Sequence, residues 1–209
     1  MSGPFRHASR GRIDRGTQVR FTFDGAEITG HPGDTVASAL LAHGVHLVGR
    51  SFKYHRPRGI LTAGSEEPNA LIRTSRAGDA ARAEPNTRAT LQELRAGLVC
   101  ESQNRWPSLR HDVGEINDRL HPLLSTGFYY KTFMWPKSFW DRVYEPLIRA
   151  SAGLGRAPTQ ADPDKYASRF HHCDLLVVGA GPAGLMAARA AARAGLEVTL
   201  VDESAEPGG

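Results

Sequence analysis

The chain has 209 residues, of which 40% are hydrophobic and 23% charged, and its formal net charge is +4. This composition is ordinary for a globular protein, and the small positive surplus suits an anionic ligand or an acidic partner rather than nucleic acid. Two cysteines, Cys100 and Cys173, cannot supply a disulfide framework, which favours a reducing, cytoplasmic location.

The sequence shows neither a signal peptide nor a membrane span. Residues 1–20 lack an apolar run. The most apolar stretch, 175–200, is interrupted by Arg189, Arg193 and Glu197, charges that a spanning helix would not normally carry near its middle. We therefore expect a soluble protein without membrane contacts. Residues 1–17 are predicted to be a basic arm, either a flexible tail or a segment that docks on a partner subunit.

Residues 18–102 are predicted to form a small α+β module of β-grasp type. Apolar and polar residues alternate over 19–24, which predicts a half-buried strand. Asp24-Gly25 then favours a tight turn into a return strand over 27–30. Asp34 or Thr35 can cap a helix over 36–43 that Gly44 ends.

The second half of this module is predicted to contain a basic loop and two short strands. The strands are expected at 69–73 and 98–102, with an exposed excursion over 75–88 between them. The loop over 49–64 carries the candidate phosphate or interface contacts Arg50, Lys53, Arg56 and Arg58. Arginine forks suit phosphate oxygens, so the loop either binds an anionic group or an acidic partner, or is a solvated turn with structural arginines.

Residues 103–165 are predicted to be an aromatic connector and linker. The aromatic stretch over 127–140 fits either internal packing or a subunit interface, where Tyr, Trp and Phe are enriched. A linker is expected over 153–164, which is rich in Gly, Pro and polar residues. The histidines show no metal-ligand spacing, His55 and His111 have no visible partners, and no catalytic residue is identified.

Residues 166–209 are predicted to be the first βαβ part of an α/β Rossmann domain that binds FAD or NAD. A continuous apolar run over 173–178 predicts a buried strand. The motif Gly179-Ala180-Gly181-Pro182-Ala183-Gly184 follows, then a helix over 183–194 and a second strand over 197–201. This strand–glycine–helix–strand context predicts an adenine dinucleotide site; the alternative is a glycine-rich helix start without a ligand.

Each part of the motif has a physical task in this interpretation. Gly179 allows the tight turn, Gly181 lets the backbone approach a pyrophosphate, and Gly184 lets the helix pack on the strand. The helix N-terminus attracts phosphate. Asp202, 23 positions after Gly179, or its neighbour Glu203 can accept hydrogen bonds from ribose hydroxyls, and an acid there disfavours NADP.

Two strands are too few for a doubly wound sheet, since the first would have one bare edge. We therefore expect this chain to be a fragment of a longer polypeptide, inactive when isolated.

The motif segments at 179–184, 202–203 and 207–209 resemble the two-dinucleotide-binding flavoprotein superfamily. The runs at 21–25, 30–41, 51–60, 127–136 and 144–148 are more specific and resemble the alpha subunits of heterotetrameric sarcosine oxidases. That resemblance implies an enzyme complex with beta, gamma and delta subunits that oxidatively demethylates sarcosine to glycine, using oxygen and tetrahydrofolate. It also implies a noncovalent NAD on this chain, with FAD as the alternative, and FAD and FMN in the partner subunit.

The N-terminal module also resembles the [2Fe–2S] ferredoxin-like domain of related amine and opine dehydrogenase subunits. Those domains carry four cluster cysteines, whereas this sequence has none over 1–99. Because a cluster needs thiolate ligands, the expectation is the fold without an iron–sulfur cluster or other metal.

Two alternatives to a sarcosine oxidase subunit remain open at this point. One is the dinucleotide-binding subunit of another amine, proline or opine dehydrogenase. The other is a noncatalytic scaffold that holds a structural dinucleotide.

Overall fold

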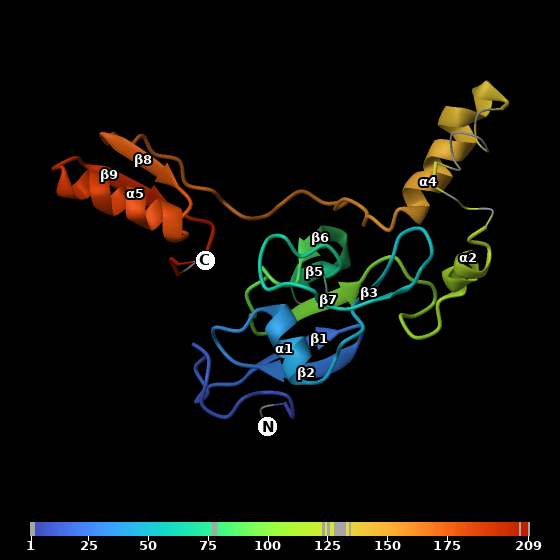
Figure 1. Ribbon diagram of the computed structural model, residues 1–209, viewed down its shortest axis with the longest axis horizontal. Coiled ribbons are helices and arrows are strands. Elements are labelled where there is room, and N and C mark those ends of the chain that lie inside the picture. Colours follow the sequence, from blue (N-terminus) through green and yellow to red (C-terminus); the bar gives the residue numbers. More distant parts are fainter. Residues whose placement is uncertain are drawn as a thin grey trace. The chain divides into compact units, whose positions relative to one another are not determined.

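The computed structural model describes residues 3–76, 79–122, 124, 126–127, 133, 135–204 and 206–208. The chain divides into two compact units, Met1–Asp162 and Pro163–Gly209, each described by itself (Figure 1). The boundary, after Asp162, lies within the linker predicted over 153–164. Six positions of the predicted aromatic stretch, residues 128–132 and 134, lie outside the described residues.

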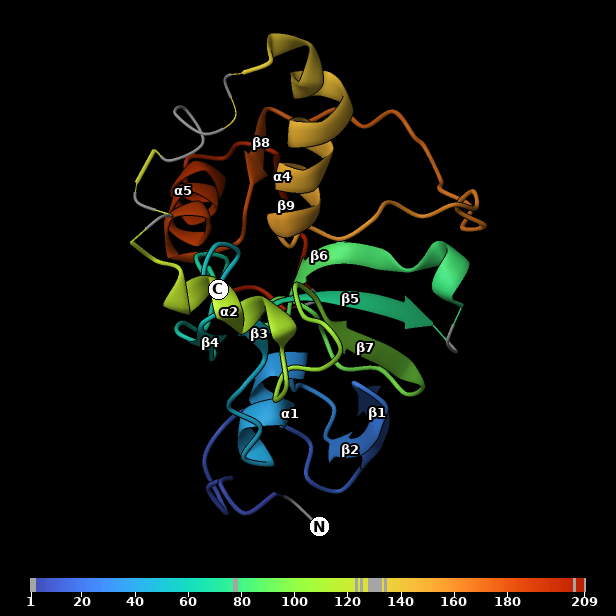
Figure 2. The ribbon, with the colours of Figure 1, turned by 90° about the vertical axis from the view of Figure 1, so that its right-hand side faces the viewer.

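The first unit is built on a five-stranded mixed sheet, seen from the side in Figure 2. Its strands are β1 (Val19–Phe23), β2 (Ala26–Gly30), β5 (Leu71–Arg76), β6 (Glu84–Arg88) and β7 (Leu98–Ser102). Their order is β2-β1-β7-β5-β6, in which β1 and β7 are parallel and the other neighbours antiparallel. This mixed sheet fits the predicted β-grasp type.

Local sequence signals account for the first hairpin and helix. Asp24 and Gly25 adopt positive φ angles of 48° and 81°, as the two-residue turn requires. Thr35 caps α1 (Val36–Ala42) in a reciprocal capping box with Ser38. The apolar face of α1 packs on the sheet, so that Val36 and Leu40 join Phe21, Ile28 and Ile72 in one buried core (Figure 1). The predictions for this region are confirmed.

The predicted exposed excursion over 75–88 is wrong in its second half. A 3₁₀ turn, η1 (Ala80–Arg82), leads into β6, which pairs with β5 at the sheet edge. Its register shifts between Ile72 and Thr74, and Asn86 has a positive φ of 59°. In the sequence, Pro85 argues against a strand, and this is why β6 was not predicted. In the structure the proline is tolerated, because one side of an edge strand makes no ladder hydrogen bonds.

The basic arm lies against its own module, which differs from both predicted alternatives. The Phe5 amide donates to the Ala42 carbonyl at 3.1 Å. Both terminal nitrogens of Arg6 donate to the buried Asp34 carboxylate, at 3.0 and 2.7 Å. Further along, the Asp14 amide donates to the Pro32 carbonyl. A buried, bidentate charge pair explains why this end of the arm has one defined position.

The rest of the first unit consists of short elements. A two-stranded ladder joins β3 (Gly49–Arg50) and β4 (Pro57–Arg58). After β7 follow η2 (Val113–Glu115), α2 (Ile116–Arg119), η3 (Lys137–Phe139), the π-helical turn η4 (Trp140–Tyr144) and α4 (Glu145–Ser151). Among the described residues, no helix is both long and apolar enough to span a membrane.

The second unit is a single βαβ motif, the start of a Rossmann domain. Strand β8 (Leu175–Val178) runs parallel to β9 (Val198–Val201), and α5 (Pro182–Arg193) connects them. Gly195, with a φ of 84°, follows the end of α5 as predicted. The expected burial of β8 on both faces is wrong for this chain: β9 and α5 contact the strand, but Leu176 and Val178 remain exposed.

Candidate functional site

A glycine corner forms the junction between β8 and α5. Gly179 leaves the strand with a φ of 102°, and its amide donates to the Val201 carbonyl at 2.8 Å, which ties the corner to β9. Gly184 faces the Gly179 carbonyl so closely that a Cβ would collide with it. Gly181, by contrast, opens on free space. Gly179 thus makes the turn and Gly184 allows close packing of the helix, while the pyrophosphate contact at Gly181 stays a prediction.

The first turn of α5 offers donors at this corner. Gly181 is the N-cap and Pro182 is the first helical residue, a position where a missing N–H costs nothing. The N–H groups of Ala183 and Gly184 belong to the first turn, whose donors have no intrahelical acceptors. Together with the positive end of the helix dipole, they can bind the phosphate oxygens of a dinucleotide.

Asp202 follows β9 and its carboxylate reaches the glycine corner. One carboxylate oxygen accepts from the Ala180 amide at 2.5 Å, and the other accepts from the Ser204 amide at 2.7 Å. The Ala180 N–H, and then that of Ser204, hold the pKa of Asp202 below its ordinary value, so the group is ionised at neutral pH. Each oxygen keeps acceptor capacity for a ribose hydroxyl. Glu203 is exposed, and no partner for it is found among the described residues.

The segment after β9 contributes a contact that sequence reasoning missed. The Gly208 amide donates to the Ala180 carbonyl at 2.8 Å, and Gly208 has a φ of 129°. Ala180 is thus held by Asp202 through its N–H and by Gly208 through its carbonyl, and it is the one described residue of the second unit with a buried apolar side chain. The sequence feature that could have indicated this contact is the glycine pair after Pro207, because glycine readily adopts the positive φ seen at Gly208.

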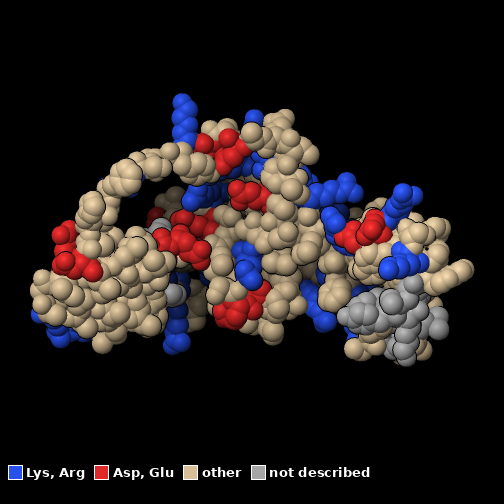
Figure 3. Space-filling model, turned by 90° about the horizontal axis from the view of Figure 1, so that it is seen from above, with Lys and Arg blue, Asp and Glu red and all other residues tan. Residues whose placement is uncertain are grey.

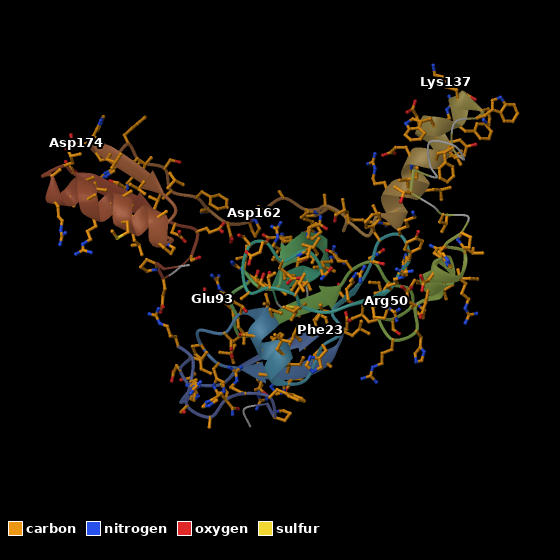
Figure 4. All side chains as sticks on the ribbon, in the orientation of Figure 1. Phe23, Arg50, Glu93, Lys137, Asp162 and Asp174 are labelled. Atoms are coloured by element: carbon orange, nitrogen blue, oxygen red, sulfur yellow. The ribbon has the colours of Figure 1, made fainter. Side chains whose placement is uncertain are left out.

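Arg50 in the basic loop is a structural residue. Its side chain is 3% exposed and lies between the sheet and the segment that carries α2 (Figure 4). It donates to the Leu109 carbonyl at 2.8 Å and to the His55 carbonyl at 2.9 Å, and pairs with Glu115 at 3.3 Å. Because these acceptors satisfy a buried charge, Arg50 has little capacity left for a ligand.

His55 has a partner that its sequence neighbours do not reveal. Its Nδ1 lies 2.5 Å from the buried carboxylate of Asp112, which also accepts from the amides of Trp106 and Gly114. His55 adopts a φ of 53°, so the loop backbone turns to present the ring. The prediction that His55 lacks a partner is therefore wrong, since the two residues are 57 positions apart in the sequence.

The other three basic residues of the loop, Lys53, Arg56 and Arg58, differ in the contacts that their side chains make. Arg56 pairs with Asp118 at 2.7 Å and lies over the Tyr54 ring, as does the Lys53 ammonium. Arg58 is exposed, and within the described part of the chain its guanidinium makes no hydrogen bond or ion pair. In the view of Figure 3 basic and acidic side chains are interspersed, and no continuous basic stripe is visible.

A buried carboxylate organises the loop before β5. Glu67 is almost fully buried, and its oxygens accept from the amides of Leu61, Thr62, Asn69 and Ala70 at 2.6–3.2 Å. Burial by itself would raise the pKa of this carboxyl, but the four backbone donors outweigh it and hold the pKa below its ordinary value. Sequence reasoning missed Glu67, because nothing in its neighbours predicts a converging set of amides.

Both units match known domain families. Residues 16–105 match the 2Fe-2S iron-sulfur cluster binding domain, and residues 174–209 match the FAD dependent oxidoreductase family. The second match covers β8, α5, β9 and the glycine corner.

These matches correct the expected cofactors. The expected preference for NAD over FAD is not supported, because the second unit matches a family of FAD dependent oxidoreductases. The expectation that the first module carries no iron–sulfur cluster is contradicted, because residues 16–105 match a family of cluster-binding domains.

The first unit contains one cysteine, Cys100, that could act as a thiolate ligand of a cluster. Cys100 is fully buried in β7, and its burial, with a smaller effect of the Asp24 charge, raises the pKa of its thiol to about 12. Among the described residues no group of three or more His, Cys, Asp or Glu side chains could hold a metal ion. The described side chains therefore do not supply the four ligands that a cluster needs.

Relatives of known name align over nearly the whole chain. It is 62% identical over 205 residues to the sarcosine oxidase alpha subunit of Rhizobium meliloti (strain 1021), covering 98% of this chain and 20% of that protein. It is 37% identical to the corresponding subunit of Corynebacterium sp. (strain P-1), covering 99% of this chain and 16% of that protein. The chain thus spans about a fifth of the length of these relatives.

Two more distant similarities were found. A ferredoxin–NADP reductase of Salinispora tropica is 59% identical over 40 residues, which are 19% of this chain and 12% of that protein. The crystal structure of L-proline dehydrogenase from P. horikoshii superposes with a TM-score of 0.45 at 19% identity, over 94% of this chain and 26% of that one. The predicted resemblance is thereby confirmed: over nearly its whole length, this chain is related in sequence to the N-terminal part of sarcosine oxidase alpha subunits.

Proposed function

We propose that this chain is the N-terminal part of the alpha subunit of a multisubunit sarcosine oxidase. The observation that carries the proposal is the 62% identity over 98% of the chain to a subunit of that name. The complex would also contain beta, gamma and delta subunits and would work in the cytoplasm, as the resemblance implies.

Within that assembly, the second unit would hold FAD through its ADP moiety. The open side of Gly181 leaves room for the pyrophosphate, and the first turn of α5 supplies N–H donors to it. Asp202, ionised and aimed at the corner, would accept from the ribose hydroxyls. When bound, the flavin supplies the capacity to take up two electrons; this chain supplies binding and orientation.

The reaction of the whole complex balances as an oxidative demethylation. Two electrons and two protons leave the N-methyl group and nitrogen of sarcosine, which gives an imine that water splits into glycine and formaldehyde. Oxygen takes the electrons and protons and becomes hydrogen peroxide. Tetrahydrofolate, when present, would take up the formaldehyde carbon as methylene-tetrahydrofolate. The described residues of this chain supply no catalytic base that we can identify, so the chemistry is assigned to the rest of the assembly.

Substrate-dependent oxygen uptake by the natural complex tests this proposal. We expect uptake with sarcosine, release of formaldehyde in equal amount, and less free formaldehyde when tetrahydrofolate is added. L-Proline serves as the comparison substrate and should give at least about tenfold slower uptake, a difference of about 1.4 kcal/mol in transition-state binding. Uptake with L-proline but not with sarcosine would overturn the assignment.

A further inference from the structure

A pocket of about 340 Å³ lies in the first unit, away from the glycine corner. Its walls come from the β3–β4 ladder, the start of β5, the end of β7 and the turn after α4. Pockets of this size take small organic ligands. Arg50 and Arg58 of the basic loop line this pocket, but no residue of the glycine corner does. The proposed function therefore does not account for the pocket.

The charge of the pocket is positive. Arg50 and Arg58 are among the lining residues, and no Asp or Glu is. The Arg50 guanidinium is committed to Leu109, His55 and Glu115, as described above. The Arg58 guanidinium is exposed and, within the described residues, has neither a hydrogen bond nor an ion pair. Its planar fork is therefore available for a carboxylate or phosphate.

The same pocket that Arg58 lines also contains an exposed aromatic side chain. Phe52 lines the same pocket and is 64% exposed, and none of the described aromatic rings stacks on it. Leu154, on the opposite segment, is exposed as well. An exposed aromatic ring in a concave site offers a planar partner a stacking surface worth about 0.5–1.5 kcal/mol beyond its area.

The pocket is held in shape by hydrogen bonds across its walls. The Asn104 side-chain amide donates to the Arg50 carbonyl at 3.1 Å, which ties the end of β7 to β3. The Gln103 side-chain amide donates to the Gly153 carbonyl at 3.4 Å, which ties the residue after β7 to the turn after α4. Ligands bind more tightly to a preformed site because less ordering accompanies binding.

From these observations we infer that the pocket between the β3–β4 ladder and the turn after α4 is a second ligand site, which takes a small planar aromatic anion. The anionic group would bind the Arg58 fork while the ring stacks on Phe52. Asn69 also lines the pocket, and its side chain, which makes no hydrogen bond among the described residues, would donate to a polar edge of the ring.

The test uses four probes that separate the two recognition elements, with the natural complex as the protein. Phenyl phosphate and benzoate carry both a ring and a charge, inorganic phosphate carries only the charge, and benzyl alcohol only the ring. Saturation-transfer NMR gives the dissociation constant of phenyl phosphate, and competition gives those of the other probes. We expect phenyl phosphate and benzoate to bind at least tenfold more tightly than either single-element probe.

Two variants locate the site, and a third is the matched control. Arg58→Gln should weaken phenyl phosphate at least tenfold, and Phe52→Ala should weaken it to the level of inorganic phosphate. Arg56→Gln removes a neighbouring arginine that pairs with Asp118 and does not line the pocket, so it should leave the constant unchanged. Unchanged unfolding temperatures would show that the variants fold.

Three results would overturn the inference. The first is no binding of phenyl phosphate, and the second is equal affinity of all four probes. The third is an equal loss in Arg58→Gln and Arg56→Gln, which would indicate unspecific attraction by the basic loop. If the natural complex bound phenyl phosphate as expected but did not oxidise sarcosine, the proposed function would be wrong and the second ligand site would stand.

Discussion

In the first unit Leu40 and Ile72 are fully buried, whereas in the second Leu176 and Val178 expose 55% and 77% of their surface. Both units nevertheless form well-defined backbone corners, at Asp24-Gly25 and at Gly179. The contrast teaches that a glycine corner is set by local backbone requirements, while stability depends on a closed core. The glycine corner of the second unit is thus formed although Leu176 and Val178 on the neighbouring strand are exposed.

The largest effect on dinucleotide binding is expected from a substitution at Gly184, where α5 packs closely on the glycine corner. Gly184→Val places a branched side chain against the Gly179 carbonyl, which should separate α5 from β8. We expect dinucleotide binding by the full-length subunit to fall at least about 100-fold, or about 2.8 kcal/mol, as measured by titration with FAD. Binding that survives this substitution would mean that the corner does not form the site.

A matched pair of leucines measures the difference between the units directly. Leu40→Ala opens a cavity in the closed core and should lower the free energy of unfolding by about 2–5 kcal/mol. Leu176→Ala removes a half-exposed side chain and should cost less than about 1 kcal/mol in this chain. Urea unfolding of the two variants checks both values. Equal costs would contradict the contrast drawn here.

The buried carboxylate of the first unit should confer a pH dependence. The pKa of Glu67 is held below its ordinary value of 4.5, so its stabilisation is complete above about pH 4.5 and is lost as the pH falls through the lowered folded-state pKa. Glu67→Gln should lower the free energy of unfolding by about 1.5–3 kcal/mol at pH 7 and flatten this acid dependence.

The exposed neighbour Glu66 provides the control for that measurement. Glu66→Gln removes the same charge one residue away, at an exposed side chain to which no amide of the described residues donates. It should leave both the stability and its pH profile nearly unchanged. Identical profiles for the two variants would show that the amide cluster around Glu67 does not stabilise the carboxylate.

The smallest effect is expected from an ion pair at the surface of the basic loop. Arg56 and Asp118 are both partly exposed, and such pairs contribute about 0–1 kcal/mol. Arg56→Gln should therefore change the unfolding midpoint in urea very little. Arg50→Gln, which leaves buried acceptors unpaired, should lower it clearly. A large effect of Arg56→Gln would mean that the loop depends on its surface charges.

The parts of the fold that sequence reasoning predicted are those with local causes. The hairpin at Asp24-Gly25, the cap at Thr35 and the glycine corner each follow from a few consecutive residues. Strand β6 was missed because Pro85 and a register shift conceal its period. The pairs His55–Asp112 and Arg50–Leu109 join residues more than 50 positions apart, and no pattern in one sequence indicates which distant partners meet.

The central claim, that the corner at Gly181 holds FAD, is tested most directly by Gly181→Ala in the full-length subunit. A Cβ at this position meets no atom of the chain within 4 Å, so the fold should be unchanged, yet the methyl group would occupy the space that the pyrophosphate needs. We predict an unchanged unfolding temperature together with FAD binding weakened at least tenfold, or about 1.4 kcal/mol. Unaltered FAD binding would contradict the claim.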